Sequence, residues 1–362
     1  MAKVVYLLGA GASRGSRDYD GKSVSREEIE NDNNHILAGI PLVNEIPQRL
    51  RYIIGLLSSA DFSQHERDIT LETKEVVTFS DAKKRLINDL QWLADESYRH
   101  ATIDTFAKKL YLTNQKEKFA KLEKLLSIFF IIEQYLNKTD GRYDTFLANI
   151  LTNKIEIPDE IAILTWNYDS QFEIAFREYK RDIISSPSDV GVCSKYDNIK
   201  ECCTRPKIFK LNGSASFDGF YSLGKDCENS YQNLNDIYIG ELLERYLEDK
   251  NYSKLSFAWE YRLDNVELSD LFWQEVKTEI SEAKILVTIG YTFPFFNREI
   301  DRKLFEMMPN LSHIYIQDPN AEQLKNNILP VLSDVQKSVA KNLQDKITII
   351  TNCDQFYLPP EL

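Results

Sequence analysis

Two polar residues, Asn167 and Asp169, directly follow the apolar run "IAILTW" at 161–166. An amide and a carboxylate two residues apart at the end of a strand can orient a water molecule and stabilise developing positive charge. Cleavage of a glycosidic C–N bond needs such groups, because its transition state resembles an oxocarbenium ion. A turn that caps the following helix uses the same residue types, and these two residues by themselves favour that simpler interpretation.

A glycine-rich turn at residues 9–13 follows the first apolar run of the chain. A strand that enters such a turn and then a helix directs main-chain N–H groups toward an anion such as a phosphate. The dinucleotide fingerprint G-x-G-x-x-G is met at its first two glycines, whereas Arg14 occupies the third position. The alternative is a plain turn that needs small residues, and the sequence favours the dinucleotide interpretation. The candidate cofactor-binding residues here are Gly9, Ala10, Gly11, Ala12 and Ser13.

Two later strand ends carry further candidates for binding a nucleotide. The run "KILVT" leads into Gly290, Tyr291 and Thr292, and the threonine hydroxyl can either bond a ribose or phosphate or cap a helix. Asp318 follows "HIYIQ", where a carboxylate can accept hydrogen bonds from ribose hydroxyls. Because Asp318 precedes Pro319, it can equally be a turn residue.

Six short apolar runs recur along the chain at long intervals, and they are near-continuously apolar instead of alternating. This pattern is typical of parallel strands that helices cover on both faces. It predicts an α/β protein with a doubly wound, Rossmann-like parallel sheet, whose strand ends form a ligand crevice. The predicted strands are 4–9, 161–166, 207–212, 284–290, 313–318 and 346–351.

The interval between the first two strands exceeds what one crossover connection needs, so we expect a helical insertion at 42–157. A second helical and loop insertion is expected at 218–282, and the two insertions form a second lobe. The Rossmann-like domain then comprises 1–41, 158–217 and 283–362. Helical periodicity within the first insertion is clearest near 42–57, 81–97, 102–112 and 116–137.

The composition narrows the classes of function. The formal net charge is −12, and an acidic surface repels nucleic acid, so direct nucleic-acid binding is not expected. The longest apolar run, 125–132, is far shorter than the roughly 18 residues that a membrane span needs. With no targeting segment apparent, a cytoplasmic location is expected. The cysteines form no CxxC pair, which favours free thiols over a metal site, even in the cluster Cys193, Cys202 and Cys203.

Six short motifs follow one another between residues 7 and 320: "LLGAGAS", "AGIPL", "TWNYD", "KLNGS", "VTIGYTFP" and "IYIQDPN". In this order they resemble the sirtuin family, and most of all the sirtuin-like NAD-hydrolase domains of bacterial anti-phage defence systems. The segment "HATIDTF" at 100–106 is similar to part of the same subgroup. The likeness is collective, since each motif is short.

The resemblance implies that the chain binds NAD⁺ as its substrate and hydrolyses it to nicotinamide and ADP-ribose. The family's Gly-Ala-Gly turn matches residues 9–11, with Ala12 and Ser13 completing it, and would hold the NAD phosphates. The family's Asn-x-Asp pair matches Asn167 and Asp169, with the asparagine at the nicotinamide ribose.

Two further matches and one departure concern the later strands. Gly290 and Thr292 match the family's Gly-Thr/Ser strand tip, and Asp318 corresponds to the strand end at the adenine ribose. Family members that remove acyl groups from proteins carry a four-cysteine zinc ribbon after the His-Gly segment, but only Cys227 and Cys353 follow it here. The resemblance therefore implies NAD⁺ hydrolysis without a metal, and not deacylation.

The second departure is at Asn212. Where the family reads Leu-His-Gly-Ser, this chain reads "LNGS" at 211–214. The family's histidine is the general base on the ribose hydroxyls, and a neutral amide cannot titrate near neutral pH. Three explanations stay open: the chain is an inactivated variant, hydrolysis proceeds slowly through Asn167 and Asp169, or another histidine substitutes. Only His100 is a candidate for the last, and a lone histidine beside a helix start is more often structural.

The resemblance also implies a role: depletion of NAD⁺ during phage infection. Such domains act in assemblies, so a homo-oligomer and a separate partner, such as a hexameric HerA-like ATPase, are expected. A non-catalytic subunit that binds NAD or ADP-ribose is the alternative, and Asn212 favours it. A nicotinamide-dependent dehydrogenase is disfavoured because Arg14 breaks the dinucleotide fingerprint.

Overall fold

The computed structural model describes residues 1–14, 39–59, 68–71, 73–137, 139–180, 191–197, 206–216, 236–248, 253–262, 266–335, 343 and 346–362. Contacts between Cα atoms divide the chain into two compact units. Unit 1 comprises Met1–Asp18, Thr139–Ser214 and Ser256–Leu362, and unit 2 comprises Tyr19–Lys138 and Ala215–Leu255.

Unit 1 is built on a seven-stranded sheet in the order β5-β6-β4-β1-β7-β8-β9, and every neighbouring pair of strands is parallel. This confirms the predicted α/β class with a doubly wound, Rossmann-like sheet, and all six predicted strands are present. The seventh strand, β5, was not predicted. The strands are β1 (Val4–Leu8), β4 (Ile161–Thr165), β5 (Val192–Ser194), β6 (Ile208–Lys210), β7 (Ile285–Ile289), β8 (His313–Gln317) and β9 (Ile347–Ile350).

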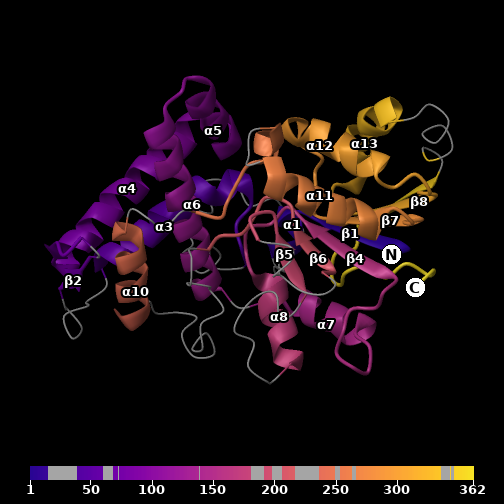
Figure 1. Ribbon diagram of the computed structural model, residues 1–362, viewed down its shortest axis with the longest axis horizontal. Helices are drawn as coiled ribbons and strands as arrows, with labels where there is room; N and C mark the ends of the chain where they lie inside the picture. The colour runs from indigo at the N-terminus through magenta and orange to yellow at the C-terminus, as the bar shows by residue number, and fades with distance from the viewer. Residues whose placement is uncertain are drawn as a thin grey trace. The chain divides into compact units, whose positions relative to one another are not determined.

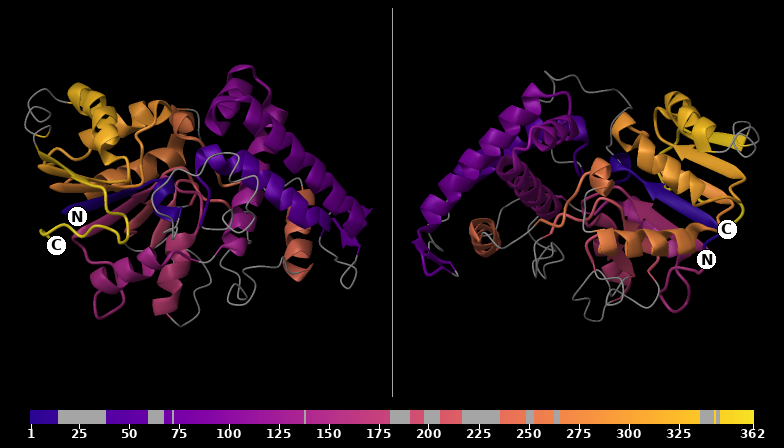
Figure 2. Two further views of the ribbon diagram at one scale, coloured as in Figure 1. Left: turned by 180° about the vertical axis from the view of Figure 1, so that it is seen from behind. Right: turned by 45° about the horizontal axis from the view of Figure 1, so that its top comes forward.

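Helices cover both faces of this sheet (Figure 1). One layer consists of α11 (Val266–Ile280), α12 (Arg298–Glu306) and α13 (Ala321–Val335), and the other of α7 (Gly141–Ile150) and α8 (Gln171–Tyr179). Within β1, Val5 packs in the core under the first layer and Tyr6 in the core under the second. Because successive residues of a strand face opposite sides, a sheet covered twice must be apolar throughout. Figure 2 shows these layers from two further directions.

Unit 2 is mostly helical, and the helical segments expected between 42 and 137 are all present. The side chains of Thr78 and Thr102 cap α4 and α5 by accepting main-chain N–H groups, each at 3.1 Å. From residue 125 to its end, α6 is buried. Within the described parts of the chain, no helix has both the length and the apolar character that crossing a membrane requires. The elements are η1 (Val43–Glu45), α3 (Ile46–Ser59), β2 (Ile69–Thr70), β3 (Val76–Val77), α4 (Phe79–Arg99), α5 (Ile103–Leu112), α6 (Lys116–Leu136) and α10 (Asp236–Leu247).

The boundaries of unit 1 differ from the expected ones at α7 and α11, which the sequence places in the insertions. Both helices belong to unit 1 because their apolar residues complete the cores against the sheet. Tyr143 and Phe146 of α7 lie in one core with Tyr6. Phe272 of α11 lies in the other core, with its ring centroid 6.0 Å from that of Phe209 on β6.

Candidate functional site at the carboxyl ends of β1, β4 and β7

The candidate site lies where the chain reverses its direction across the sheet. β1 pairs with β4 on one side and with β7 on the other, and Leu8 is level with both Thr165 and Ile289. From β1 the chain passes to β4, β5 and β6, and then returns to β7 on the opposite side of β1. In open α/β sheets, ligands bind outside the carboxyl ends of the strands at such a switch point. The predicted site residues after β1, β4 and β7 therefore share one edge of the sheet.

The glycine-rich turn after β1 packs directly on the turn after β7. The N–H of Gly9 donates to the carbonyl of Ile289 and that of Gly11 to the carbonyl of Gly290, both at 3.0 Å. A Cβ on Gly11 would lie 2.7 Å from the Cα of Gly290. The N–H of Ala12 donates to the carbonyl of Gly9 at 2.9 Å. The N–H groups of Gly11 and Ala12 are thus bonded within the protein, and the glycines serve the close approach of two backbones.

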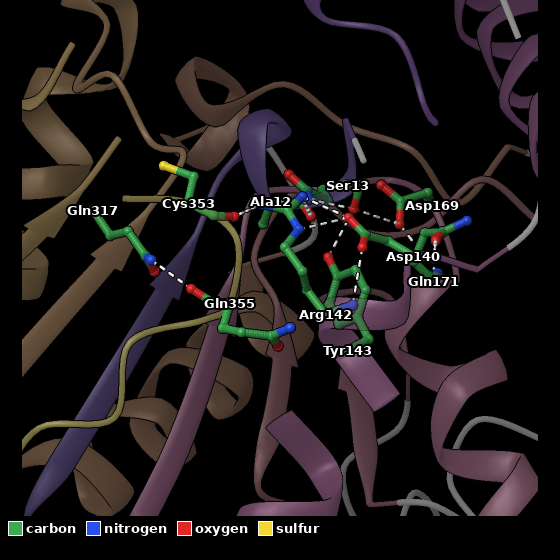
Figure 3. Close-up of polar contacts among 11 residues, drawn as sticks. Ala12, Ser13, Asp140, Arg142, Tyr143, Asp169, Gln171, Gln317, Cys353 and Gln355 are labelled. Atoms are coloured by element: carbon green, nitrogen blue, oxygen red, sulfur yellow. Dashed lines mark hydrogen bonds and ion pairs between the residues drawn. The ribbon is translucent and has the colours of Figure 1, made fainter. Parts of the chain in front are cut away.

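Ser13 lies at the end of the short helix α1 (Ala10–Ser13) and joins the two catalytic candidates. Figure 3 shows it with one of them, Asp169. It is fully buried. Its Oγ accepts from Nδ2 of Asn167 and donates to Oδ1 of Asp169, each at 3.0 Å. The Tyr143 hydroxyl lies 2.8 Å from the same Oγ. Since a hydroxyl has one hydrogen to donate, Tyr143 is the donor in this last bond. Ser13 therefore positions Asn167 and Asp169, and its own hydroxyl is fully used by protein groups.

Asp169 is buried, and two donors hold the same oxygen of its carboxylate. Besides Ser13, the N–H of Gln171 donates to its Oδ1 at 3.1 Å, which fixes the turn that starts α8. Burial raises the pKa of Asp169, and the positive charge of Lys210 and these hydrogen bonds oppose that rise. A cavity of about 10 Å³ beside Asp169 is also lined by Asn167. One water molecule needs about that volume.

Asn212 lies next to these groups in the sheet register. Thr165 is level with Lys210, and the N–H of Leu211 donates to the carbonyl of Thr165 at 2.9 Å, so 167 and 212 follow neighbouring strand ends. The Asn212 side chain is 8% exposed. Among the described residues its Oδ1 has no hydrogen-bond partner. A buried acceptor without a partner is costly, and a donor on a bound ligand would satisfy it.

The other predicted binding residues are placed differently. Thr292 is exposed after β7. Asp318 is 9% exposed after β8, and its Oδ1 accepts from the N–H of Asn320 at 2.8 Å, as in the turn that its sequence context allows. Burial raises the pKa of Asp318. Tyr291 is buried and its ring stacks on that of Trp166, with the centroids 5.9 Å apart.

Tyr291 is held by a carboxyl group that the sequence did not single out. Its hydroxyl donates to Asp301 of α12, with distances of 2.8 and 3.0 Å to the two oxygens, and accepts from Nδ2 of Asn297 at 3.0 Å. Asp301 is 1% exposed. These hydrogen bonds fix Tyr291, and with it the loop after β7, against Trp166, which precedes Asn167.

We expect Asp301→Asn to remove a pH dependence from the stability of unit 1. Burial raises the pKa of Asp301 well above its ordinary value, so the folded state binds this proton more tightly than the unfolded chain does. Protonated Asp301 therefore contributes its full stabilisation to the folded state below the ordinary pKa of about 4. This stabilisation is lost as the pH rises through the raised pKa. Urea unfolding of both proteins across this range measures the effect, and identical pH profiles would contradict it.

Arg142 of α7 is a second residue that sequence analysis missed, and it anchors the turn after β1 (Figure 3). It is 5% exposed and paired with Asp140, with Nη2 and Nε at 2.5 and 2.8 Å from Oδ2. Its Nη2 also donates to the carbonyl of Ala12 at 3.0 Å, and its Nη1 donates to the carbonyl of Cys353 at 3.2 Å. One planar side chain thus ties α7, α1 and the C-terminal segment together.

We expect Arg142→Lys to lower the free energy of unfolding by about 1–3 kcal/mol, since an ammonium group cannot make all these bonds at once. Chemical denaturation measures the change. Arg99→Lys, on an arginine whose side chain is 68% exposed, is the control and should change stability by less than about 0.5 kcal/mol. Equal effects of the two substitutions would show that the buried contacts do not anchor the turn.

His100 lies in unit 2, where both of its ring nitrogens have partners. Its Nδ1 is 2.8 Å from the carbonyl of Glu96, so Nδ1 is the donor, and its Nε2 is 3.4 Å from Nζ of Lys109. The ring stacks on Phe106 with the centroids 4.7 Å apart. These contacts give His100 a structural role at the junction of α4 and α5.

No group of three metal-ligating side chains occurs within the residues that the structure describes. Cys193 is buried in β5 as a free thiol, whereas Cys202, Cys203 and Cys227 lie outside the described residues. Asn167 and Asp169 remain the polar groups that the fold brings to the switch point, with Asn212 beside them.

Comparison with known protein families and with curated proteins gives no match to this chain.

Proposed function

We propose that this protein binds NAD⁺ at the switch point of its sheet and hydrolyses the bond between nicotinamide and ribose. Water adds to the anomeric carbon and releases one proton to the solvent, nicotinamide leaves with the bonding electron pair, and ADP-ribose is the second product. One observation carries the proposal: Asn167 and Asp169, which follow the carboxyl end of β4, both form a hydrogen bond with the buried hydroxyl of Ser13. An amide and a carboxylate fixed by one group are preorganised for a transition state that develops positive charge.

The residues have distinct roles in this proposal. The carboxylate of Asp169 stabilises the positive charge that develops on the ribose ring, and Asn167 orients the ribose or the attacking water. Asn212 accepts a hydrogen bond from a ribose hydroxyl through its Oδ1, which no described residue contacts as a hydrogen-bond donor. Because an amide cannot take the proton, hydrolysis is slow compared with an enzyme that has a histidine there.

The rest of the NAD⁺ molecule would lie along the carboxyl ends of β1, β7 and β8. The turn at residues 9–13 would lie beside the pyrophosphate, and Gly9, Gly11 and Gly290 let this turn pack closely on the turn after β7. Thr292 offers an exposed hydroxyl at the end of β7, and Asp318 offers a carboxylate to the adenine ribose at the end of β8.

The biological role in the proposal is depletion of NAD⁺ in anti-phage defence, within a homo-oligomer and with a separate partner such as a HerA-like ATPase. This part rests on the resemblance of the sequence motifs to sirtuin-like defence domains. A slow basal rate would be compatible with this role, because a partner or a trigger would then activate the site.

The direct test is to incubate the purified full chain with NAD⁺ and to follow nicotinamide and ADP-ribose by chromatography. Slow, equimolar release of both products is expected, and Asp169→Asn should abolish it. A dehydrogenase would instead produce absorbance of the reduced nicotinamide when alcohol or hydroxy-acid substrates are added. If neither product forms with or without candidate partners, the hydrolase proposal is wrong.

A non-catalytic subunit that binds NAD or ADP-ribose is the second candidate, and the neutral Asn212 side chain favours it. Calorimetric titration with NAD⁺ and with ADP-ribose separates the two functions. Binding of both ligands without release of nicotinamide would support the binding subunit.

A further inference from the structure

Lys210 is a lysine buried beneath the candidate site. It is the last residue of β6 and is 1% exposed. Its Nζ donates to the main-chain carbonyl of Asp169 and, at 2.9 Å, to Oε1 of Glu173 on α8. A lysine is rarely buried unless it is paired, so these contacts account for its place in the sheet.

Because Nζ of Lys210 bonds the main-chain carbonyl of Asp169, its positive charge lies near the carboxylate of the same residue. Its ion pair is with Glu173. The pKa of Asp169 is raised first by burial and further by the negative charge of Glu173, while Lys210 lowers it. With two carboxylates and one ammonium group, this cluster carries one net negative charge when all three are ionised. The titratable groups facing Asp169 are Tyr143 from α7 (with Arg142 and Asp140 acting on that tyrosine), Lys210 from β6 and Glu173 from α8.

We propose that Lys210 is a positioning residue, which fixes the loop after β4 through the Asp169 carbonyl and supplies the counter-charge for the Asp169 carboxylate. This inference rests on the proposed function, in which Asp169 stabilises a developing cation. An ionised carboxylate does so far better than a neutral carboxyl group. The inference also explains why a polar side chain ends a strand that is otherwise apolar.

The test measures the titration of Asp169 itself, so it does not depend on activity. The carboxyl carbon is followed by NMR in protein labelled with ¹³C-aspartate, and Asp169→Asn identifies the signal. In Lys210→Met we expect a proton affinity of Asp169 about 10- to 1000-fold higher than in the wild type, since a nearby opposite charge lowers a carboxyl pKa by about 1–3. Lys210→Arg, which keeps the charge, should recover most of the wild-type titration.

Lys207 gives a matched control. It directly precedes the same strand at the opposite end, is 7% exposed, and its Nζ lies 2.6 Å from Oε1 of Glu279. Lys207→Met should leave the titration of Asp169 unchanged. If Lys210→Met does not fold, Lys210→Met/Glu173→Gln removes both partners and avoids an unpaired buried carboxylate. A higher proton affinity of Asp169 is still expected in the double variant, because Lys210 bonds the Asp169 main chain directly, whereas the hydrogen bond of Glu173 in this cluster is with Lys210.

An unchanged Asp169 titration in folded Lys210 variants would overturn the inference. Where nicotinamide release is measurable, the acidic limb of its pH–rate profile should move to higher pH in Lys210→Met and stay unchanged in Lys207→Met. Absence of release from the wild-type protein would count against the proposed function only. The NMR titration would still decide the role of Lys210.

Discussion

Replacing Asn212 with histidine is expected to raise the rate of nicotinamide release by about 10²–10⁴-fold, the usual contribution of a general base. The position is suitable because Asn212 follows the strand beside Asn167, and its Oδ1 has no partner in the part of the chain that the structure describes. A histidine there would take a proton from a ribose hydroxyl near neutral pH, which the amide cannot do. Timed chromatography of nicotinamide at saturating NAD⁺ measures the rate.

Two further variants make this result specific. Asn149→His adds a histidine on the exposed side of α7, outside the site, and should leave the rate at the wild-type level. Asn212→His/Asn167→Ala should lose the gain, because Asn167 holds the ribose or the water that reacts. A rate that stays unchanged in Asn212→His would mean that Asn212 does not limit hydrolysis. An equal gain from Asn149→His would show that the effect does not come from the site.

The second large effect is structural: Gly290→Ala should lower the free energy of unfolding by about 2–5 kcal/mol. A Cβ on Gly290 would lie 2.5 Å from the Cα of Gly11 and from the main-chain N of Ala12. The φ of Gly290 is +60°, a region that costs residues with a Cβ about 1–2 kcal/mol. The clash between backbones adds roughly 1–3 kcal/mol, because neither turn can move without breaking hydrogen bonds to the other. Urea unfolding measures the loss.

Gly141→Ala is the matched control for this substitution. Gly141 begins α7 in the same unit, and a Cβ there would meet no atom within 4 Å. Alanine at that position should leave stability unchanged or raise it by up to about 1 kcal/mol. If Gly290→Ala were as stable as Gly141→Ala, the packing of the two turns would not constrain the site.

The strands were predictable because burial on both faces leaves a local trace, a run of apolar residues such as those of β1 and β4. β5 left no such trace. It contains only three residues, ends in Ser194 and lies in a polar segment, so its place at the edge of the sheet depends on pairing with β6. The domain boundaries at α7 and α11 also escaped prediction, since an amphipathic helix does not reveal which core it covers.

The candidate site was predictable only in part. Polar residues after apolar runs pointed to Asn167 and Asp169, but nothing local linked them to Ser13, which is 154 and 156 residues away in sequence. Arg142 and Lys210 escaped notice for the same reason. Their charges are buried beside partners that the chain brings from distant segments, and charged residues elsewhere in the sequence look the same.

The sequence by itself determined the α/β class, the positions of six strands and the polar residues that follow them, because burial on both faces of the sheet makes each of these strands a continuous apolar run. Only the tertiary structure decided which of those polar groups meet. The order β5-β6-β4-β1-β7-β8-β9 brings the ends of β4 and β7 to either side of β1, and with them Ser13 to Asp169 and Gly11 to Gly290. The physical reason is that burial is a property of one segment, whereas the partner of a buried polar group depends on how all the segments are arranged.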